Sequence, residues 1–559
     1  MITTLFFLLA LAAMPVMASS EIVKSDAGKK EVVLTRCKSL EKQLTEPNVT
    51  YVIKRKHNMK GRELSLPQGC CLKFKGGCIF NGTLVGSETI IENGNENSFK
   101  NLTFAGTWRP AVVSPEWFGA KGDGKTDDTR AIQRAADFAA GSVLRFTDGR
   151  GYKYTKGISV KGNTTIEGYG SFIVKACYSA FLHNEHNNED IVDENISIKG
   201  LTGITLNDLY RGLWLWMVGV KGLEIADCSL SNHTPIDKDQ HSQWCVTISG
   251  EDMEVRSCRI DNAGGGLFSD GIHVFNAKNC SIHDCIIITE DDCIGFAPEI
   301  PKEQVEYKKF NQISSNIRVY DNRLSGNRNC IRFEVRENAP KQFAYQNVTV
   351  SNNTLVGTTT PVSSFLYLHD YRKQTAALNS SFVVDGLKVE GDLIGEGRNF
   401  IEVFGKNPVT QPQNVVNITD VSISNISVNL SGYENFVRCI GASKVRLSGC
   451  SFFATDRSDS HIAIRDCDEV EIEGCDFTTY TQYPFIQATN SSGTLKSNRI
   501  ERLSTEKDAG IGIYLEASEK MEVKENEISN FSIGFRDGRQ GKRTDTNHYD
   551  RCRLNVQKK

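Results

Sequence analysis

The stretch Leu223-Glu224-Ile225-Ala226-Asp227-Cys228-Ser229-Leu230 contains a pattern that the chain then repeats. Apolar residues occupy its first, third and eighth positions, and Cys stands at the sixth. The same order returns in Met253-Glu254-Val255-Arg256-Ser257-Cys258-Arg259-Ile260. An alternation with a period of two predicts short β-strands with one buried face. The constant sixth position predicts a turn that recurs in every copy.

Further copies of this pattern extend over most of the chain, with Cys or Asn at the turn. The turn position is held by Cys285, Asn322, Asn353, Cys450, Cys475, Asn498 and Asn526. Apart from the long interval between Asn353 and Cys450, successive turns are 23 to 37 residues apart, which suits one coil of a parallel β-helix with loops of variable length. One coil cannot bury its apolar face alone, so stacking must make a continuous core. The predicted fold is all-β, a right-handed parallel β-helix (a solenoid) with an N-terminal capping region.

The ends of the chain predict an exported protein. Residues 1–18 are almost wholly apolar and lead through Met17-Ala18 into Ser19, as in a secretory signal peptide cleaved near Ala18. We expect a β-rich capping region over 19–110, a catalytic β-helix over 111–537 and a polar C-terminal tail over 538–559. The expected location is periplasmic or secreted.

Composition narrows the range of partners. The net charge is −3 and the pI is about 6.4, so nothing favours nucleic acid. No later stretch is apolar for long enough to span a membrane. Many of the 17 cysteines stand at the buried turn, where a reduced thiol packs as a small hydrophobe. We expect Cys70, Cys71 and Cys78 to be the better candidates for disulfides.

Two segments place acidic residues together. In Ser269-Asp270-Gly271-Ile272 and Asp291-Asp292-Cys293-Ile294, an Asp stands two residues before an Ile, and the two positions are 22 residues apart. Their backbones should therefore lie one strand spacing apart, roughly 4.8 Å. An Asp-Asp pair alone could simply cap a turn. Three crowded carboxylates raise one another's pKa, which favours a catalytic or cation-binding role.

Two motifs resemble known families. The run Trp117-Phe118-Gly119-Ala120-Lys121-Gly122-Asp123-Gly124-Lys125-Thr126-Asp127-Asp128-Thr129 resembles the N-terminal helix cap of the pectate-lyase-like right-handed β-helix superfamily. Asp127 or Asp128 should cap the helix that follows, because the run lacks the ligand spacing of a calcium hand. The central block resembles the polygalacturonases of glycoside hydrolase family 28, where Asn-Thr-Asp-Gly precedes Gly-Asp-Asp-Cys. Here the motifs are Phe268-Ser269-Asp270-Gly271 and Glu290-Asp291-Asp292-Cys293.

That resemblance implies catalysis by carboxylates, with Asp291 as the acid and Asp270 with Asp292 as the base pair. Two motifs of the family are missing, however. Its Gly-His-Gly is absent, and its Arg-Ile-Lys, which binds a uronate carboxylate, becomes Arg332-Phe333-Glu334. Because Glu334 would repel galacturonate, we expect a neutral sugar, such as a galactoside or rhamnoside, at the cleavage subsite.

Alignment of the inward residues predicts which side chains point outward. Our alignment places in register Leu213, Val246, Ile272, Ile294, Ile331, Leu366 and Ile401. It yields one exposed column of Trp214, Thr247, His273, Gly295, Arg332, Tyr367 and Glu402. A second column, two residues on, holds Trp216, Ser249, Phe275, Ala297, Glu334, His369 and Phe404. From these we predict a substrate-binding set of Trp214, Trp216, His273, Arg332, Glu334, Tyr367 and His369, with small residues leaving room beside the aspartates.

The predicted function is glycoside hydrolysis of a polysaccharide or oligosaccharide, by inversion, with no metal or other cofactor. Inversion needs one protonated carboxyl and one carboxylate that activates water. Two alternatives stay open. A calcium-dependent polysaccharide lyase would use the aspartates as Ca²⁺ ligands and Arg332 as the base. A noncatalytic carbohydrate-binding surface β-helix would have no need of three stacked carboxylates.

Overall fold

A computed structural model provides the coordinates, and all statements below concern the residues that it describes. These are residues 30–558 except 37, 188–191, 206–212, 233–243, 264–268, 299–312, 336–342, 358–363, 371–379, 392, 396–397, 406–417, 455–460, 504–508 and 540–544. The expected signal peptide lies outside them. None of the helices in these ranges combines the length and apolar character needed to cross a membrane.

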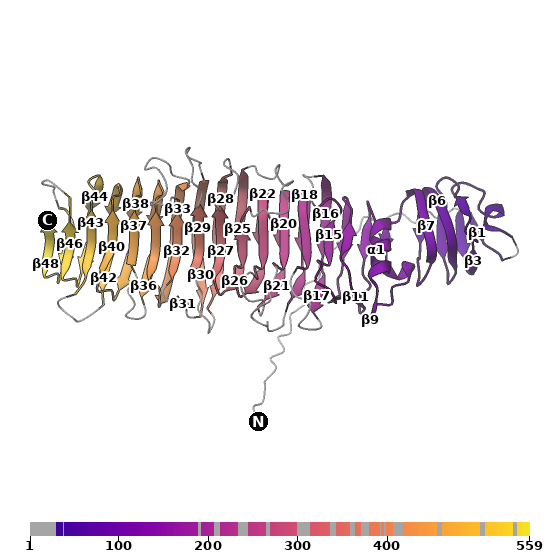
Figure 1. The fold of residues 1–559 in the computed structure, drawn as a ribbon, viewed down its shortest axis with the longest axis horizontal. Coiled ribbons are helices and arrows are strands. Elements are labelled where there is room, and N and C mark those ends of the chain that lie inside the picture. Colours follow the sequence, from indigo (N-terminus) through magenta and orange to yellow (C-terminus); the bar gives the residue numbers. More distant parts are fainter. Residues whose placement is uncertain are drawn as a thin grey trace, which may run out of the picture.

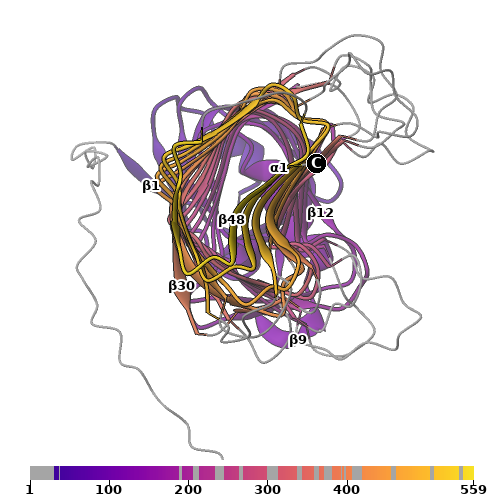
Figure 2. The same cartoon turned by 90° about the vertical axis from the view of Figure 1, so that its left-hand side faces the viewer.

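The chain folds into a right-handed parallel β-helix, as predicted. Strands from β8 (Val112–Val113) to β48 (Leu554–Lys558) join in one parallel, 41-stranded sheet that winds coil upon coil. Figure 1 shows the coils stacked into a rod, and Figure 2 shows them superposed along its axis. Inward residues such as Ile272, Ile294 and Ile331 are wholly buried and stack on one another in register.

The predicted register is correct over six of its seven coils. In β18 (Leu215–Ala226), however, Leu215 rather than Leu213 pairs with Val246 of β20 (Val246–Arg256). Trp216 therefore lies beside Thr247, at the start of the first column. Trp214 leaves the column altogether, so its predicted place on the binding face is wrong.

The recurring Cys or Asn forms a buried turn, as the repeat predicted. Asn322 accepts a hydrogen bond from the backbone N–H of Cys285 (3.0 Å) and donates to the carbonyl of Ile282 (2.9 Å). Asn353 repeats this arrangement one coil later, where its side-chain oxygen accepts from the N–H of Asn322 (3.1 Å). The residue before each turn residue has a positive φ, for example 54° at Asp321, which closes the corner tightly.

The N-terminal strands form a separate seven-stranded sheet. It contains β1 (Glu31–Val33), β2 (Thr50–Ile53), β3 (Lys56–Asn58), β4 (Glu63–Ser65), β5 (Cys71–Phe74), β6 (Cys78–Glu92) and β7 (Phe99–Trp108). A short 3-10 helix, η1 (Leu40–Lys42), lies between β1 and β2, and a second, η2 (Pro115–Phe118), follows β8.

The helix α1 (Thr129–Phe138) lies between the two sheets in Figure 1. Asp128 is the N-cap residue of this helix, as predicted. Its carboxylate, however, accepts hydrogen bonds from the preceding N–H groups of Lys121 (2.7 Å) and Gly122 (3.0 Å). The N–H of Thr129 is bound instead by the carboxylate of Asp127 (3.0 Å). The acidic pair therefore organises the helix start.

The expected disulfides are not found among the described cysteines. Cys70, Cys71 and Cys78 are free thiols, like the other described cysteines. Cys70 and Cys71 are adjacent and buried, and successive side chains of an extended segment point to opposite faces, so the two sulfurs diverge. Burial raises the pKa of the Cys71 thiol to about 12, which makes it unreactive.

Candidate active site

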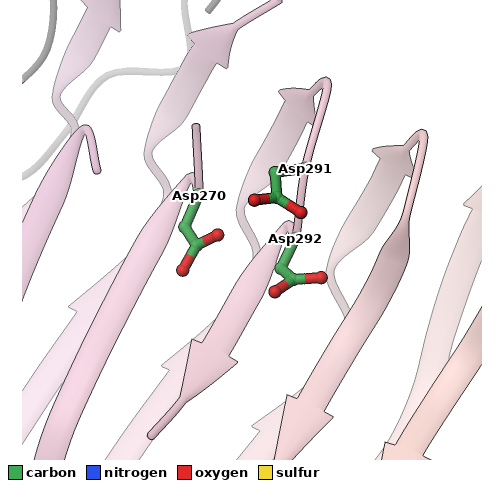
Figure 3. A group of neighbouring side chains, drawn as sticks. All are labelled: Asp270, Asp291 and Asp292. Carbon is green, nitrogen blue, oxygen red and sulfur yellow. The ribbon is translucent and has the colours of Figure 1, made fainter. Parts of the chain in front are cut away.

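Three aspartates meet at the ends of two adjacent coils (Figure 3). Asp270 precedes β22 (Ile272–His283), and Asp291 with Asp292 forms the turn between β23 (Ile286–Thr289) and β24 (Ile294–Phe296). The N–H of Gly271 donates to the carbonyl of Asp292 (2.9 Å), which places the two coils in register. One carboxylate oxygen from each aspartate lies within 4.8 Å of the others.

The aspartates are buried, and so are most members of the two columns that were predicted to be exposed, among them Thr247 and His273. The exposed fractions are 0% for Asp270, 2% for Asp291 and 1% for Asp292. The space beside Gly295 is also filled: an added Cβ there would lie 2.8 Å from Asp270 Oδ2 and 3.2 Å from Arg332 Nη2. Glycine at 295 thus leaves room for that carboxylate and guanidinium to meet.

Arg332, on β27 (Asn329–Val335), connects the acidic groups. Its Nε lies 2.5 Å from Asp292 Oδ2 and its Nη2 lies 3.3 Å from Asp270 Oδ2, while Nη1 is paired with Glu334. Asn329 donates to Asp292 Oδ1 (2.6 Å). The guanidinium offsets part of the negative charge that these buried groups would otherwise concentrate.

The surroundings move two of the carboxyl pKa values apart. Burial raises the pKa of Asp292 to about 8; Arg332 opposes that rise, and the charges of Asp270 and Asp291 add to it. Burial also acts on Asp270, but the hydrogen bond from His273 and the charge of Arg332 outweigh it and lower its pKa. The cluster therefore holds a proton near neutral pH and keeps Asp270 ionised.

His273 connects the aspartates to an aromatic group. Its Nδ1 lies 2.7 Å from Asp270 Oδ2, and its ring stacks on Trp244 with centroids 3.7 Å apart. Phe275 packs edge-on against both rings and against Trp216. An aromatic group thus borders the aspartates on the N-terminal side.

Several buried polar atoms in this region have no hydrogen-bond partner within the described part of the chain. They are His273 Nε2, Asp270 Oδ1, Thr247 Oγ1 and Ser249 Oγ. An unpaired buried donor or acceptor costs about 1–3 kcal/mol, so such a group signals a place where a ligand or water completes the hydrogen bonding.

Trp214 supports the site from behind instead of lining it. Its indole donates to Asn232 Oδ1 (3.0 Å), Asn232 donates to Asn262 Oδ1 (2.9 Å), and Asn262 donates to the carbonyl of Asp270 (2.9 Å). All three side chains are buried. This chain holds the backbone of Asp270 in place.

The remaining predicted residues lie on the C-terminal side. Tyr367 and His369 of β29 (Ser364–Asp370) stack with centroids 3.6 Å apart, and His369 is buried. Its Nε2 lies 3.4 Å from Glu402 Oε1, which also pairs with Arg438 (3.1 Å). Burial lowers the pKa of His369 although Glu402 opposes this. Tyr367 and His369 thus form a second group beside Arg332 and Glu334.

Sequence reasoning missed three members of the site, namely Trp244, Arg328 and Asn329. Arg328 Nη1 lies 3.6 Å from Asp291 Oδ1. Trp244 and Asn329 each stand two residues before an inward residue, as Asp270 and Asp292 do. Extending that offset by one coil in each direction would have found both.

Comparisons with known proteins agree with this structure. A family described as "Glycosyl hydrolases family 28" matches residues 220–302, and "Right handed beta helix region" matches residues 397–545. The first range includes all three aspartates. The tailspike protein of the E. coli bacteriophage HK620, solved as a double mutant, matches with a TM-score of 0.50 and 12% identity, over 78% of each chain.

Two curated relatives match parts of the chain. A depolymerase from Klebsiella phage K64-1, named as specific for capsule K30/K69, is 28% identical, over 33% of this chain and 29% of its own length. Polygalacturonase ADPG1 of Arabidopsis thaliana is 27% identical, over 37% of this chain and 53% of its own length. The matched region thus spans about half of one relative and less than a third of the other. The predicted resemblance to polygalacturonase-like β-helix proteins is confirmed.

Proposed function

We propose that this protein is an inverting glycoside hydrolase that acts on a polysaccharide or oligosaccharide. The observation that carries the proposal is the buried cluster of Asp270, Asp291 and Asp292, in which the pKa of Asp270 is lowered and that of Asp292 is raised. A carboxylate beside a carboxyl that keeps its proton is the pair that glycoside hydrolysis requires.

In the proposed reaction, Asp270 accepts a proton from water as the water oxygen bonds to the anomeric carbon. The bond from that carbon to the leaving oxygen breaks, and the leaving oxygen receives the proton held by Asp291 and Asp292. The family resemblance assigns delivery to Asp291, whereas the raised pKa makes Asp292 the resting holder of the proton. His273 and Arg332 keep Asp270 ionised.

The flanking groups support a sugar as the substrate. Trp216, Trp244 and Phe275 offer apolar ring faces, and the Thr247 and Ser249 hydroxyls, which have no partner among the described residues, offer hydrogen bonds. Since Glu334 pairs with Arg332, that cation is already engaged within the protein. These contacts favour a neutral sugar over a uronate at the cleavage subsite.

The calcium-dependent lyase remains the alternative to test, because the same three carboxylates could hold a cation. The position of Arg332 disfavours a bound cation, because its guanidinium already contacts two of these carboxylates, Asp270 and Asp292. We also propose that the protein is exported, which fractionation of the producing cells would test.

Incubation of the purified protein with plant, microbial and host glycans tests the reaction. We expect new reducing ends, anomeric inversion by NMR, full activity in EDTA and no ultraviolet absorbance from unsaturated sugars. Unsaturated products that require calcium would establish the lyase. Binding without turnover, equal in wild type and in Asp270→Asn, would establish the noncatalytic alternative.

A further inference from the structure

A pocket lies in the N-terminal sheet. Figure 1 shows this sheet at the far end of the rod from β48. The pocket encloses about 250 Å³ between η1 and the turn that joins β3 to β4. Its buried wall includes Leu40, Met59, Leu64 and His57. β3 is the edge strand on its side of this sheet, so no described strand pairs with the outer edge of the strand that carries His57.

The rim of this pocket is strongly basic. The charged residues that line it are Arg36, Lys38, Lys56, Lys60, Arg62 and Glu41. Glu41 pairs with Arg62 (3.0 Å), and within the described residues no acidic side chain pairs with the other four cations. The surrounding region, residues 30–110, has thirteen Lys or Arg against seven Asp or Glu, although the whole chain has a net charge of −3.

His57 supplies the second, independent observation. Its side chain is 93% buried, since its exposed fraction is 7%, and its Nε2 has no hydrogen-bond partner among the described residues. The neighbouring inward positions of its column are apolar, namely Ile79 and Phe99. A histidine with an unpaired nitrogen costs stability there unless something binds it. Burial and the nearby Arg36 keep its pKa low, so the ring is neutral and offers one N–H donor.

From these contacts we propose that the pocket, which we call the end pocket, binds an acidic sugar unit of a polysaccharide. The rim cations meet its carboxylate or sulfate, His57 hydrogen bonds to one of its oxygens, and the apolar wall receives the C–H face of the ring. A bare inorganic anion would leave the apolar wall unused. A single-stranded nucleic acid would need aromatic stacking surfaces, and the described lining contains none apart from His57. This site goes beyond the proposed hydrolysis and does not depend on it.

Affinity electrophoresis and calorimetry of the full chain test the proposal, using polygalacturonate, its methyl-esterified form, dextran sulfate, inorganic phosphate and an RNA homopolymer. We expect binding to at least one of the two acidic glycans and at least tenfold weaker binding to the methyl ester. The double variant Lys56→Gln/Lys60→Gln and the single variant His57→Phe should each weaken the binding at least tenfold.

The matched control is Lys54→Gln/Lys75→Gln, which removes the same charge from exposed residues of the same region that do not line the pocket. This control should bind within twofold of wild type. An equal loss in both double variants, no loss in His57→Phe, or equal affinity for phosphate or RNA would overturn the proposal. Asp270→Asn should keep the binding, and the pocket variants should keep turnover of a short neutral substrate, so failure here is distinct from failure of the proposed hydrolysis.

Discussion

Two turns of the same coils contrast sharply in how their polar groups are satisfied. At the Cys and Asn turn, Asn322 and Asn353 are buried and bond to backbone groups of the adjacent coils. At the aspartate turn, buried carboxylates crowd together and Asp270 Oδ1 has no partner in the described chain. Both turns carry a polar side chain at a repeated position, yet among the described residues only the first turn has its polar groups fully hydrogen-bonded within the protein.

The contrast distinguishes a structural turn, built by the Asn side chains, from a reactive site, built by the aspartates, within the same β-helix. An Asn side chain both donates and accepts, so a column of them can satisfy the backbone of each coil. A carboxylate only accepts, and a column of them is repulsive unless cations or protons intervene. Selection for stability alone would therefore favour Asn at both turns.

The largest expected effect is on turnover at the aspartate turn. Asp270→Asn, Asp291→Asn and Asp292→Asn should each lower kcat by about 10²- to 10⁴-fold, because each removes a proton donor or acceptor. The unfolding temperature of Asp292→Asn should stay equal or rise, because burial disfavours the charged carboxylate. Rates per folded molecule and calorimetric scans measure both quantities. A loss of folding with intact specific activity would mean that these residues only cap the turn.

The Cys and Asn turn should behave in the opposite way, with an effect on stability and not on turnover. Asn322→Ala leaves the N–H of Cys285 without its partner and should lower the free energy of unfolding by about 1–3 kcal/mol. Turnover per folded molecule should be unchanged. Urea unfolding and a rate normalised to folded protein test this, with Asn429→Ala, at an exposed strand position, as a control. A specific loss of activity would show that the two turns are not functionally separate.

The pH dependence of stability should distinguish the two turns as well. Asp292 keeps its proton in the folded protein up to about pH 8, whereas the unfolded chain releases it near pH 4. Between these values the folded state binds more protons, so Asp292 makes stability fall as pH rises. We expect the stability of Asp292→Asn to decrease less with rising pH than that of wild type. The stability of Asn322→Ala should decrease with the same slope as that of wild type. Unfolding temperatures from pH 5 to 8 test this, and parallel curves for wild type and Asp292→Asn would contradict the raised pKa.

The smallest expected effect concerns the choice of sugar. Glu334→Lys replaces the acidic partner of Arg332 with a cation and should raise activity on polygalacturonate several-fold relative to neutral glycans. Glu334→Gln, which removes charge without adding any, should give a smaller shift. Ratios of kcat/KM measure this preference. Strong cleavage of polygalacturonate by wild type, weakened by Glu334→Lys, would refute the proposed neutral subsite.

Much of the fold and part of the candidate site could be predicted from local patterns. The period of two and the recurring turn predicted the strands, and the shared offset of Asp270 and Asp292 from an inward Ile predicted their contact. The error at Trp214 has a simple cause. A shift of two residues keeps the same alternation, so Leu213 and Leu215 fit the pattern equally well, and only the pairing with Val246 distinguishes them.

The sequence by itself thus determined the parallel β-helix, the Cys and Asn turn and the meeting of the three aspartates, since each follows from spacing along one chain. Tertiary structure alone decided that the aspartates are buried, that Arg332 joins two of them, and that Asp292 holds a proton while Asp270 does not. Those properties depend on distances between side chains of different coils. Desolvation and Coulomb interactions follow those distances, and spacing in the sequence does not specify them.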